Sequence, residues 1–289
     1  MQPHLRLLRA TALGAATLRL KGLGLRPQPV ETEMGPLRLY CGDGGGALGT
    51  WVVLHGVGSH ATAYGGLLST LRPHVTRLVA PDLPGHGRSA GEPGHMTADQ
   101  MVTAIEQALL ETVEGPVVLL GCSLGGALAV KLALRRRLSV RAVVLCAPAG
   151  GPLSPERFEQ FLGGFDPTTY RRALDFSGRL FRRPPWFTPL VAPLVQAEFQ
   201  RPSIQSFFEQ ISAEDQFDAE TLSALDAPTL VLWGAGERLL WPEHEAFYRE
   251  HLPGGGAFEH IEDAGHSLHL EQPGVLVERA VAFVESRDP

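Results

Sequence analysis

The sequence contains no asparagine, and only two of its 25 basic residues are lysine. We interpret this bias as the mark of a GC-rich genome and draw no function from it. Cysteine is also scarce, because Cys41, Cys122 and Cys146 are an odd number without CxxC spacing. The sequence therefore predicts no disulfide framework and no zinc site. A reducing compartment fits best, so we expect a cytoplasmic protein.

Long apolar runs and an excess of positive charge are missing too. No apolar run reaches the eighteen or so residues that a membrane span requires. The formal net charge is -6, which argues against the basic face that binds nucleic acid, so we expect no nucleic-acid partner. With 289 residues, 44% of them hydrophobic, the chain can bury a large core as one domain with an insertion.

Residues 1–30 form a segment with basic side chains and no acidic ones. Leu5, Leu8, Ala12, Ala15 and Ala16 recur there at helical spacing. This pattern predicts a basic amphipathic helix that packs on the domain or frays from it. A weak contact with a membrane surface, and hence a membrane-associated protein, stays open, as does a weak signal peptide.

After residue 31, runs typical of strands alternate with runs typical of helices. Thr97 and Gln100 form a capping-box pattern that opens one of these helices. The predicted strands are residues 50–56, 74–82, 116–121, 140–148, 228–234 and 257–263, and the predicted helices are 97–114, 124–138, 242–252 and a last one from 273. Such alternation predicts an α/β fold with a mostly parallel central sheet and helices on both faces.

Residues 148–225 interrupt the alternation with helical patterns alone. More than half of the aromatic residues of the chain lie in this block. We expect a helical cap inserted into a core domain of residues 31–147 and 226–289. Most of its aromatic side chains would pack the cap, and two or three would give apolar walls to a pocket. The candidates are Phe158, Phe161, Phe165, Trp186, Phe187, Phe207 and Phe208.

The segment Gly121-Cys122-Ser123-Leu124-Gly125 fits the pattern G-x-S-x-G, between a predicted strand and a predicted helix. In that place the serine is expected on a tight, strained turn that exposes its hydroxyl. The flanking glycines are required because side chains would collide there. The start of the following helix offers free N–H groups and a positive dipole to a developing anion.

A serine hydroxyl needs a base, and the base needs an acid to hold its tautomer. His266, in the loop after the last predicted strand, is the candidate base, with His269 as the alternative. Glu237 is the candidate acid, in the turn after residues 228–234. The alternatives, Glu262, Asp263 and Glu243, are expected to cap an element or to face solvent.

These motifs together give the chain a resemblance to the α/β-hydrolase superfamily over residues 37–284. They are HGVG from His55, DLPGHGRS from Asp82, GCSLGG from Gly121, the GAGERLLWP loop and AGHSLHLEQP. The order serine, acid, histidine is that of the family. The usual acid is aspartate, and here it is glutamate, which some esterases and lipases of the fold use.

The resemblance implies that Ser123, His266 and Glu237 form a catalytic triad. It also implies an oxyanion hole made by the backbone N–H groups of Val57 and Leu124, and chemistry without cofactor or metal. His55 and the Asp82–Ser89 loop are expected to shape the surrounding turns.

The motifs and the cap resemble most the carboxylesterases and the monoacylglycerol-lipase-like members. We therefore expect a carboxylic-ester hydrolase acting through an acyl-enzyme on small esters with an apolar acyl or aryl group. Two alternatives stay open. One is a carbon–carbon bond hydrolase or perhydrolase, in which Arg171, Arg172 or Arg179 would hold a substrate carboxylate. The other is a non-catalytic ligand-binding scaffold. The sequence predicts no oligomeric state.

Overall fold

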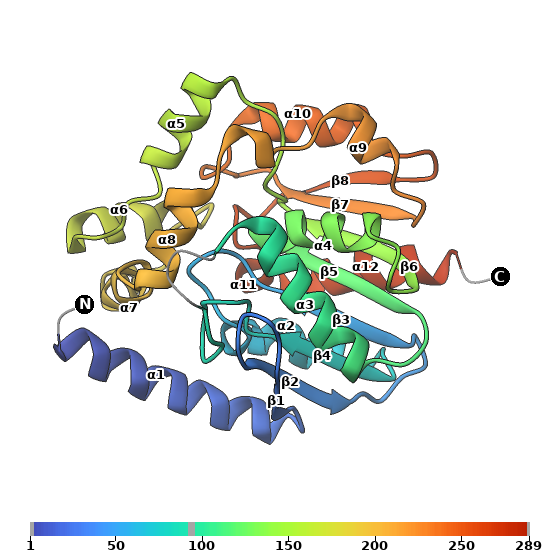
Figure 1. Cartoon of the computed structure of the whole chain (residues 1–289), viewed down its shortest axis with the longest axis horizontal. Helices are drawn as coiled ribbons and strands as arrows, with labels where there is room; N and C mark the ends of the chain where they lie inside the picture. Colours follow the sequence, from blue (N-terminus) through green and yellow to red (C-terminus); the bar gives the residue numbers. More distant parts are fainter. Residues whose placement is uncertain (1–2, 92–95, 288–289) are drawn as a thin grey trace.

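The computed structural model describes residues 3–91 and 96–287, so residues 1–2, 92–95 and 288–289 lie outside the description. One eight-stranded sheet crosses the described part of the chain in the order β1-β2-β4-β3-β5-β6-β7-β8 (Figure 1). The strands are β1 (Arg26–Val30), β2 (Leu37–Asp43), β3 (Thr50–Leu54), β4 (Arg77–Pro81), β5 (Val117–Cys122), β6 (Val140–Cys146), β7 (Thr229–Gly234) and β8 (Ala257–Ile261). All pairs from β4 to β8 are parallel. The predicted fold class is confirmed.

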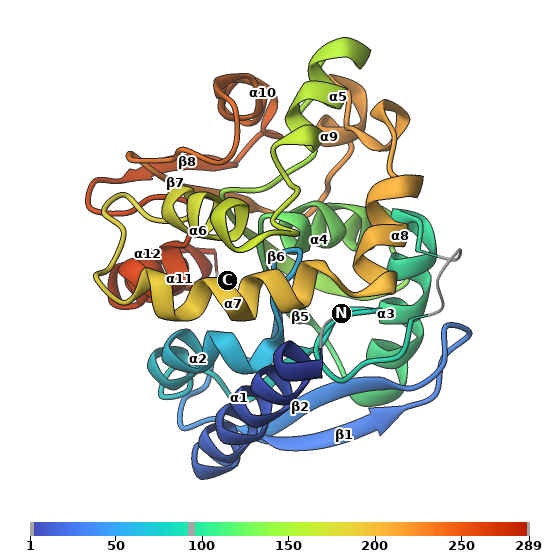
Figure 2. The same ribbon diagram turned by 90° about the vertical axis from the view of Figure 1, so that its left-hand side faces the viewer.

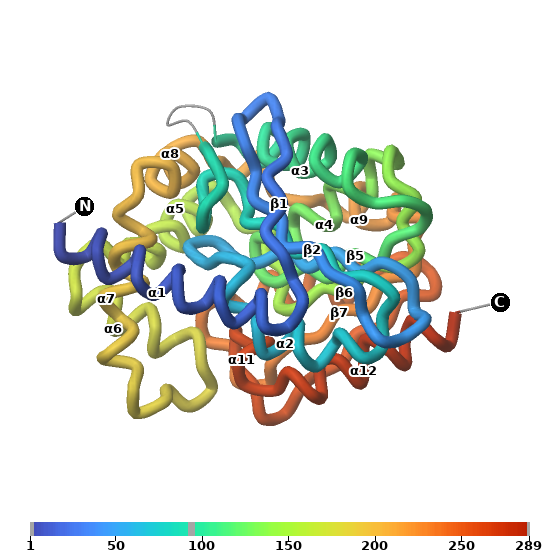
Figure 3. The backbone as a smooth tube through the Cα atoms, turned by 90° about the horizontal axis from the view of Figure 1, so that it is seen from below, coloured from blue at the N-terminus to red at the C-terminus, as the bar shows by residue number. Residues whose placement is uncertain are grey.

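Helices cover both faces of this sheet, with α3 and α4 on one face and α2, α11 and α12 on the other (Figure 3). The helices outside the cap are α1 (Pro3–Gly22), η1 (Ala61–Tyr64), α2 (Gly65–Leu71), α3 (Ala98–Thr112), α4 (Leu124–Leu134), α10 (Pro242–His251), α11 (Leu268–Glu271) and α12 (Pro273–Glu285). The capping box of Thr97 and Gln100 opens α3 as predicted. Helix α4 ends four residues before the predicted Leu138, since Arg136 takes a positive φ of 55°.

Strands β1 and β2 were not predicted, and both run antiparallel to their neighbours. Strand β1 reads RPQPV, with Pro27 and Pro29. Proline cannot donate to a β-ladder, so it is confined to edge strands, and β1 is the edge of the sheet. Residues 26–30 therefore belong to the core sheet, which corrects their assignment to the N-terminal segment.

Helix α1 packs against η1 of the core and α7 of the cap (Figure 2). Its buried residues are Leu5, Leu13 and Leu20, whereas Leu8 and Ala15 of the predicted face are exposed. The predicted helix is present, and its predicted face is confirmed in part, since Leu5 is buried and Ala12 and Ala16 are half-buried. Leu7 and Leu18 also remain exposed, and contact with a membrane surface stays a prediction. Within residues 3–91 and 96–287, no helix combines the length and apolar character of a membrane span.

The segment between β6 and β7 consists of helices, which lie over one end of the sheet (Figure 1). They are α5 (Pro155–Gly163), α6 (Tyr170–Arg179), α7 (Thr188–Phe199), α8 (Pro202–Gln210), η2 (Ala213–Asp215) and α9 (Ala219–Ser223). Each α-helix from α5 to α8 begins near a proline or with a side-chain cap from serine or threonine. The helices begin where the sequence offers these start signals.

The junction of β5 and α4 depends on Gly121, and we expect Gly121→Ala to destabilise the fold. An added Cβ would lie 2.3 Å from the carbonyl oxygen of Gly125, and such overpacking costs about 1–3 kcal/mol or more. Gly14→Ala, where nothing lies within 4 Å of the added Cβ, is the matched control and should raise the unfolding free energy slightly. Urea unfolding measures both. If Gly121→Ala and the parent protein unfold at the same urea concentration, the turn is not as crowded as the structure indicates.

Candidate active site

Ser123 occupies the turn between β5 and α4, with φ 54° and ψ -119°. Its N–H donates to the carbonyl of Cys146 at 3.0 Å, and its own carbonyl accepts from Gly126 and Ala149. A positive φ is costly for a residue with a Cβ and persists only where the surroundings enforce it. The neighbouring strand and helix hold the serine in this conformation, as the motif predicted.

The glycines of the motif allow three backbone segments to meet at Ser123. An added Cβ at Gly125 would lie 2.3 Å from the carbonyl oxygen of Leu54. At Gly56, it would lie 3.3 Å from the Cβ of Ser123. The end of β3 therefore lies directly beside the serine, so the loop that begins at His55 runs past its side chain.

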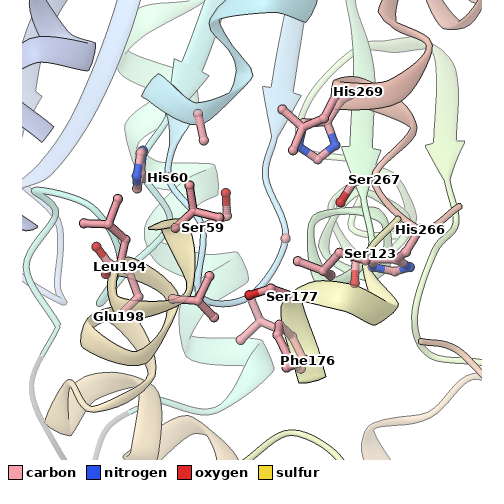
Figure 4. Close-up of a pocket in the computed structure, with 18 of the residues that line it drawn as sticks. Ser59, His60, Ser123, Phe176, Ser177, Leu194, Glu198, His266, Ser267 and His269 are labelled. Carbon is pink, nitrogen blue, oxygen red and sulfur yellow. The ribbon is translucent and has the colours of Figure 1, made fainter. Parts of the chain in front are cut away.

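His266 and Glu237 come from two other strand ends, after β8 and β7. Figure 4 shows His266 beside Ser123. His266 Nδ1 lies 2.7 Å from Glu237 Oε2, and both side chains are buried. The other carboxylate oxygen, Oε1, accepts from the N–H groups of Leu239 at 2.6 Å and Leu240 at 3.0 Å. The longer side chain of glutamate thus reaches the imidazole while its carboxylate is held by backbone donors.

The surroundings favour an ionised Glu237. Burial alone would raise the pKa of this carboxyl group, but the adjacent imidazole of His266 and the N–H groups of Leu239 and Leu240 outweigh it and hold the pKa below its usual value. A carboxylate at this place makes Nδ1 of His266 the protonated ring nitrogen. Nε2 of the neutral ring is then free to accept a proton.

The alternative residues lie elsewhere. The ring of His269 is stacked on that of Tyr64, with 3.9 Å between centroids. Asp263 is 78% exposed and pairs with Arg182 at 2.9 Å. Glu243 lies in the first turn of α10, where it pairs with Arg157. Of the alternative bases and acids with described contacts, none forms the pair that His266 forms with Glu237.

Two backbone N–H groups border Ser123. Leu124 is the first residue of α4, where a helix has no internal acceptor for the N–H. Val57 follows Gly56, and its N–H belongs to the same peptide plane as the Gly56 carbonyl. Both residues line a cavity that also contains Ser123. That these two N–H groups form an oxyanion hole stays a prediction of the family resemblance.

His55 and Tyr64 fix the peptide groups around Gly56. Nε2 of His55 accepts from the N–H of Leu83 at 2.9 Å, so Nδ1 carries the proton and donates to the Gly56 carbonyl at 2.8 Å. The Tyr64 hydroxyl accepts from the Gly56 N–H at 3.1 Å. Because a peptide group is planar, holding the Gly56 carbonyl also sets the direction of the Val57 N–H. Sequence reasoning gave His55 only a role in shaping turns and missed Tyr64.

The loop that carries His266 is tied to the cap. The N–H of Ser267 donates to the carbonyl of Leu180 at 2.8 Å. The carboxylate of Glu271 accepts from the N–H of Gly265 at 2.6 Å and from that of Arg182 at 3.0 Å. These bonds connect the base to the segment between α6 and α7. Nothing in the sequence motif signalled this connection.

Two cavities meet at Ser123, which lines both of them together with Val57. The larger has a volume of about 290 Å³ and contains His266 (Figure 4). The smaller has a volume of about 80 Å³ and contains Leu124. The serine is therefore accessible from two sides beneath the cap.

More cap aromatics line the cavities than the sequence suggested. Phe187 borders the larger cavity, whereas Trp186 is 85% exposed and borders neither. Trp186, one of the seven candidates, therefore forms no wall of either cavity. The aromatic residues on the smaller cavity are Phe158, Phe161, Phe165, Phe207 and Phe208.

The site offers neither an arginine from α6 nor a metal centre within the described part of the chain. Arg171, Arg172 and Arg179 line neither cavity, and Arg172 pairs instead with Asp166. Among the residues that the structure describes, no three histidine, cysteine or carboxylate side chains are grouped so that they could hold a metal ion. At Ser123 the site brings together a hydroxyl, an imidazole and, bonded to that imidazole, the carboxylate of Glu237.

Comparison with known proteins places the chain in a family. Residues 51–280 match the sequence profile of the alpha/beta hydrolase family. Since that match covers most of the chain, the protein belongs to the α/β hydrolase family.

Individual relatives carry several activities. Lipase LipV of Mycobacterium tuberculosis is 41% identical over 98 residues, which cover 34% of this chain and 36% of the lipase. A 2-hydroxy-6-oxononadienedioate/2-hydroxy-6-oxononatrienedioate hydrolase of Cupriavidus pinatubonensis is 28% identical over 226 residues, 70% of this chain and 75% of that enzyme. The crystal structure of a membrane phospholipase A, described as a bacterial virulence factor, superposes with a TM-score of 0.80 at 24% identity, covering 97% of this chain and 92% of that one. This last likeness concerns the fold.

We expect Glu237→Gln to lower kcat for a hydrolysed ester by about two to four orders of magnitude, because an amide neither fixes the imidazole tautomer nor stabilises its charged form. Steady-state kinetics measure the effect. Glu243→Gln, which alters the exposed partner of Arg157, is the matched control and should leave kcat unchanged. A parental kcat in Glu237→Gln would move the acid to another residue.

Proposed function

We propose that this protein is a serine hydrolase that cleaves carboxylic esters through an acyl-enzyme intermediate. One observation carries the proposal. His266, bonded to a buried and ionised Glu237 at 2.7 Å, shares a cavity with a serine that is forced into a strained turn. This combination supplies the base and a hydroxyl at the cavity wall, which nucleophilic catalysis needs.

In the first half of the reaction, Ser123 Oγ attacks the carbonyl carbon of the ester while Nε2 of His266 takes the hydroxyl proton. The negative charge on the carbonyl oxygen is stabilised by the N–H groups of Val57 and Leu124. The C–O bond to the alcohol then breaks, and the leaving oxygen receives the proton from His266. Water, deprotonated by the same ring, cleaves the acyl-enzyme and releases the acid.

The largely apolar lining of both cavities favours an ester with apolar groups over a charged substrate. Arg9 lines the larger cavity, but it pairs with Glu198 at 2.6 Å. Glu198 also pairs with Arg201 at 3.3 Å, so two guanidinium groups share this carboxylate. Lys131, which lines the smaller cavity, pairs with Asp99 at 3.1 Å. These pairings weigh against the carbon–carbon bond hydrolase, which would need a free cation to hold a substrate carboxylate.

The test is the hydrolysis of p-nitrophenyl acetate and p-nitrophenyl butyrate. We expect turnover by the parent protein and a loss of about four orders of magnitude or more in Ser123→Ala. Ser267→Ala, which changes a neighbouring hydroxyl in the same cavity, is the control and should keep most of the activity. If no activated ester is turned over, and a ligand binds equally to the parent and to Ser123→Ala, the protein is a binding scaffold instead.

A further inference from the structure

The two cavities at Ser123 differ in which part of the proposed machinery they contain. Only the larger one is lined by His266, and only the smaller one by Leu124. Val57 borders both, so the expected position of the carbonyl oxygen lies where they meet. The two substituents of a bound ester must therefore enter different spaces.

The chemistry decides which substituent enters which cavity. The leaving oxygen has to receive a proton from Nε2 of His266, so it must lie within hydrogen-bond reach of that ring. Beyond this oxygen, the alcohol part continues on the side of His266. The acyl chain, attached to the same carbonyl carbon, is directed away from the ring.

We propose, on the basis of the ester hydrolysis argued above, that the larger cavity binds the alcohol part of the substrate and the smaller cavity binds the acyl part. With about 290 Å³ against about 80 Å³, the substrate class is esters of a bulky alcohol with a short acyl group. The volume of the smaller cavity is less than a third of that of the larger one, which is the basis for assigning it the shorter group.

The walls of the smaller cavity agree with a short acyl group. Helices α5 and α8 line it with aromatic side chains, among them Phe161 and Phe208. The ring of Phe161 contacts those of Phe165 and His244 at centroid distances of 4.9 and 5.0 Å. Because protein cores are close-packed, moving these rings to make room for a longer acyl chain would cost free energy.

The larger cavity extends from His266 toward the N-terminal helix. Figure 4 shows Ser123 and His266 at one side and His60, Leu194 and Glu198 at the other. Helix α1 contributes Arg9, Ala12 and Leu13 to its wall, and α7 contributes Leu194 and Glu198. This chamber is mostly apolar, with the Arg9–Glu198 ion pair at its far side. It suits a long or bulky alcohol.

The ring of His60 also lies at that far side and stays uncharged near neutral pH. Burial and the charges of Arg9 and Arg201 lower its pKa to about 4, and it shares a hydrogen bond with Thr62 Oγ1 at 2.7 Å. The chamber thus presents to the end of the alcohol a neutral imidazole and a Glu198 carboxylate that is already paired with Arg9 and Arg201.

The experiment compares two isomeric esters, octyl acetate and ethyl octanoate. They have the same composition and exchange the long group between alcohol and acid. We expect kcat/KM for octyl acetate to exceed that for ethyl octanoate by about tenfold or more. An equal or reversed preference would overturn the assignment of the cavities. If the protein cleaves neither of these esters and no p-nitrophenyl ester, the proposed function itself is refuted.

One variant tests each cavity, and neither changes a proposed catalytic group. Leu194→Trp fills the larger one and should lower kcat/KM for octyl acetate about tenfold or more, while ethyl octanoate changes less than threefold. Phe208→Ala opens the smaller one and should raise the relative rate for ethyl octanoate. Both esters are measured on one preparation, so their ratio does not depend on how much of the variant folds. Ethyl acetate, small on both sides, is the control. If Leu194→Trp impairs ethyl octanoate alone, the assignment is reversed.

Discussion

The structure depends on the crowded turn that joins β5 to α4. Gly121 and Gly125 let the backbone segments at Ser123 approach to distances that a Cβ would prevent. The turn forces Ser123 to φ 54°. In this conformation the serine side chain lies at the carboxyl end of the parallel strands, where open α/β sheets bind ligands. Strain at one residue is thus maintained by packing that involves the whole sheet.

The other groups reach Ser123 because parallel strands end at the same edge of the sheet. The loops after β3, β7 and β8 carry Val57, Glu237 and His266. Hydrogen bonds from the cap then tie the His266 loop to the segment after α6. The cap is therefore connected to the proposed base as well as covering the site. A displacement of this segment would also move the imidazole of His266. The shape of the larger cavity and the position of the base are therefore coupled.

Much of this could be predicted from the sequence. The β-branched runs defined six strands, and G-x-S-x-G between a strand and a helix located the turn at Ser123. The order of elements singled out Glu237 and His266, which the structure brings to 2.7 Å. Two-sided burial and strict local geometry leave strong patterns of this kind in a sequence.

Other features depend on contacts that leave no local pattern. Strand β1 carries two prolines and was missed, because its place is defined by its partner and not by its own propensity. The buried face of α1 is set by α7 and η1, which lie far away in the sequence. The hydrogen bond from His55 to the Gly56 carbonyl and the stack of Tyr64 on His269 arise likewise only when the loops assemble. The division of the site into two cavities is a property of the assembled cap.

The central claim is that Ser123 is a nucleophile activated by His266. Covalent labelling with a fluorophosphonate, located by mass spectrometry of the digested protein, tests it most directly. The account predicts one adduct, on the peptide that contains Ser123, formed by the parent and formed far more slowly by His266→Ala. An adduct on a different residue, or labelling at the same rate without His266, would contradict it.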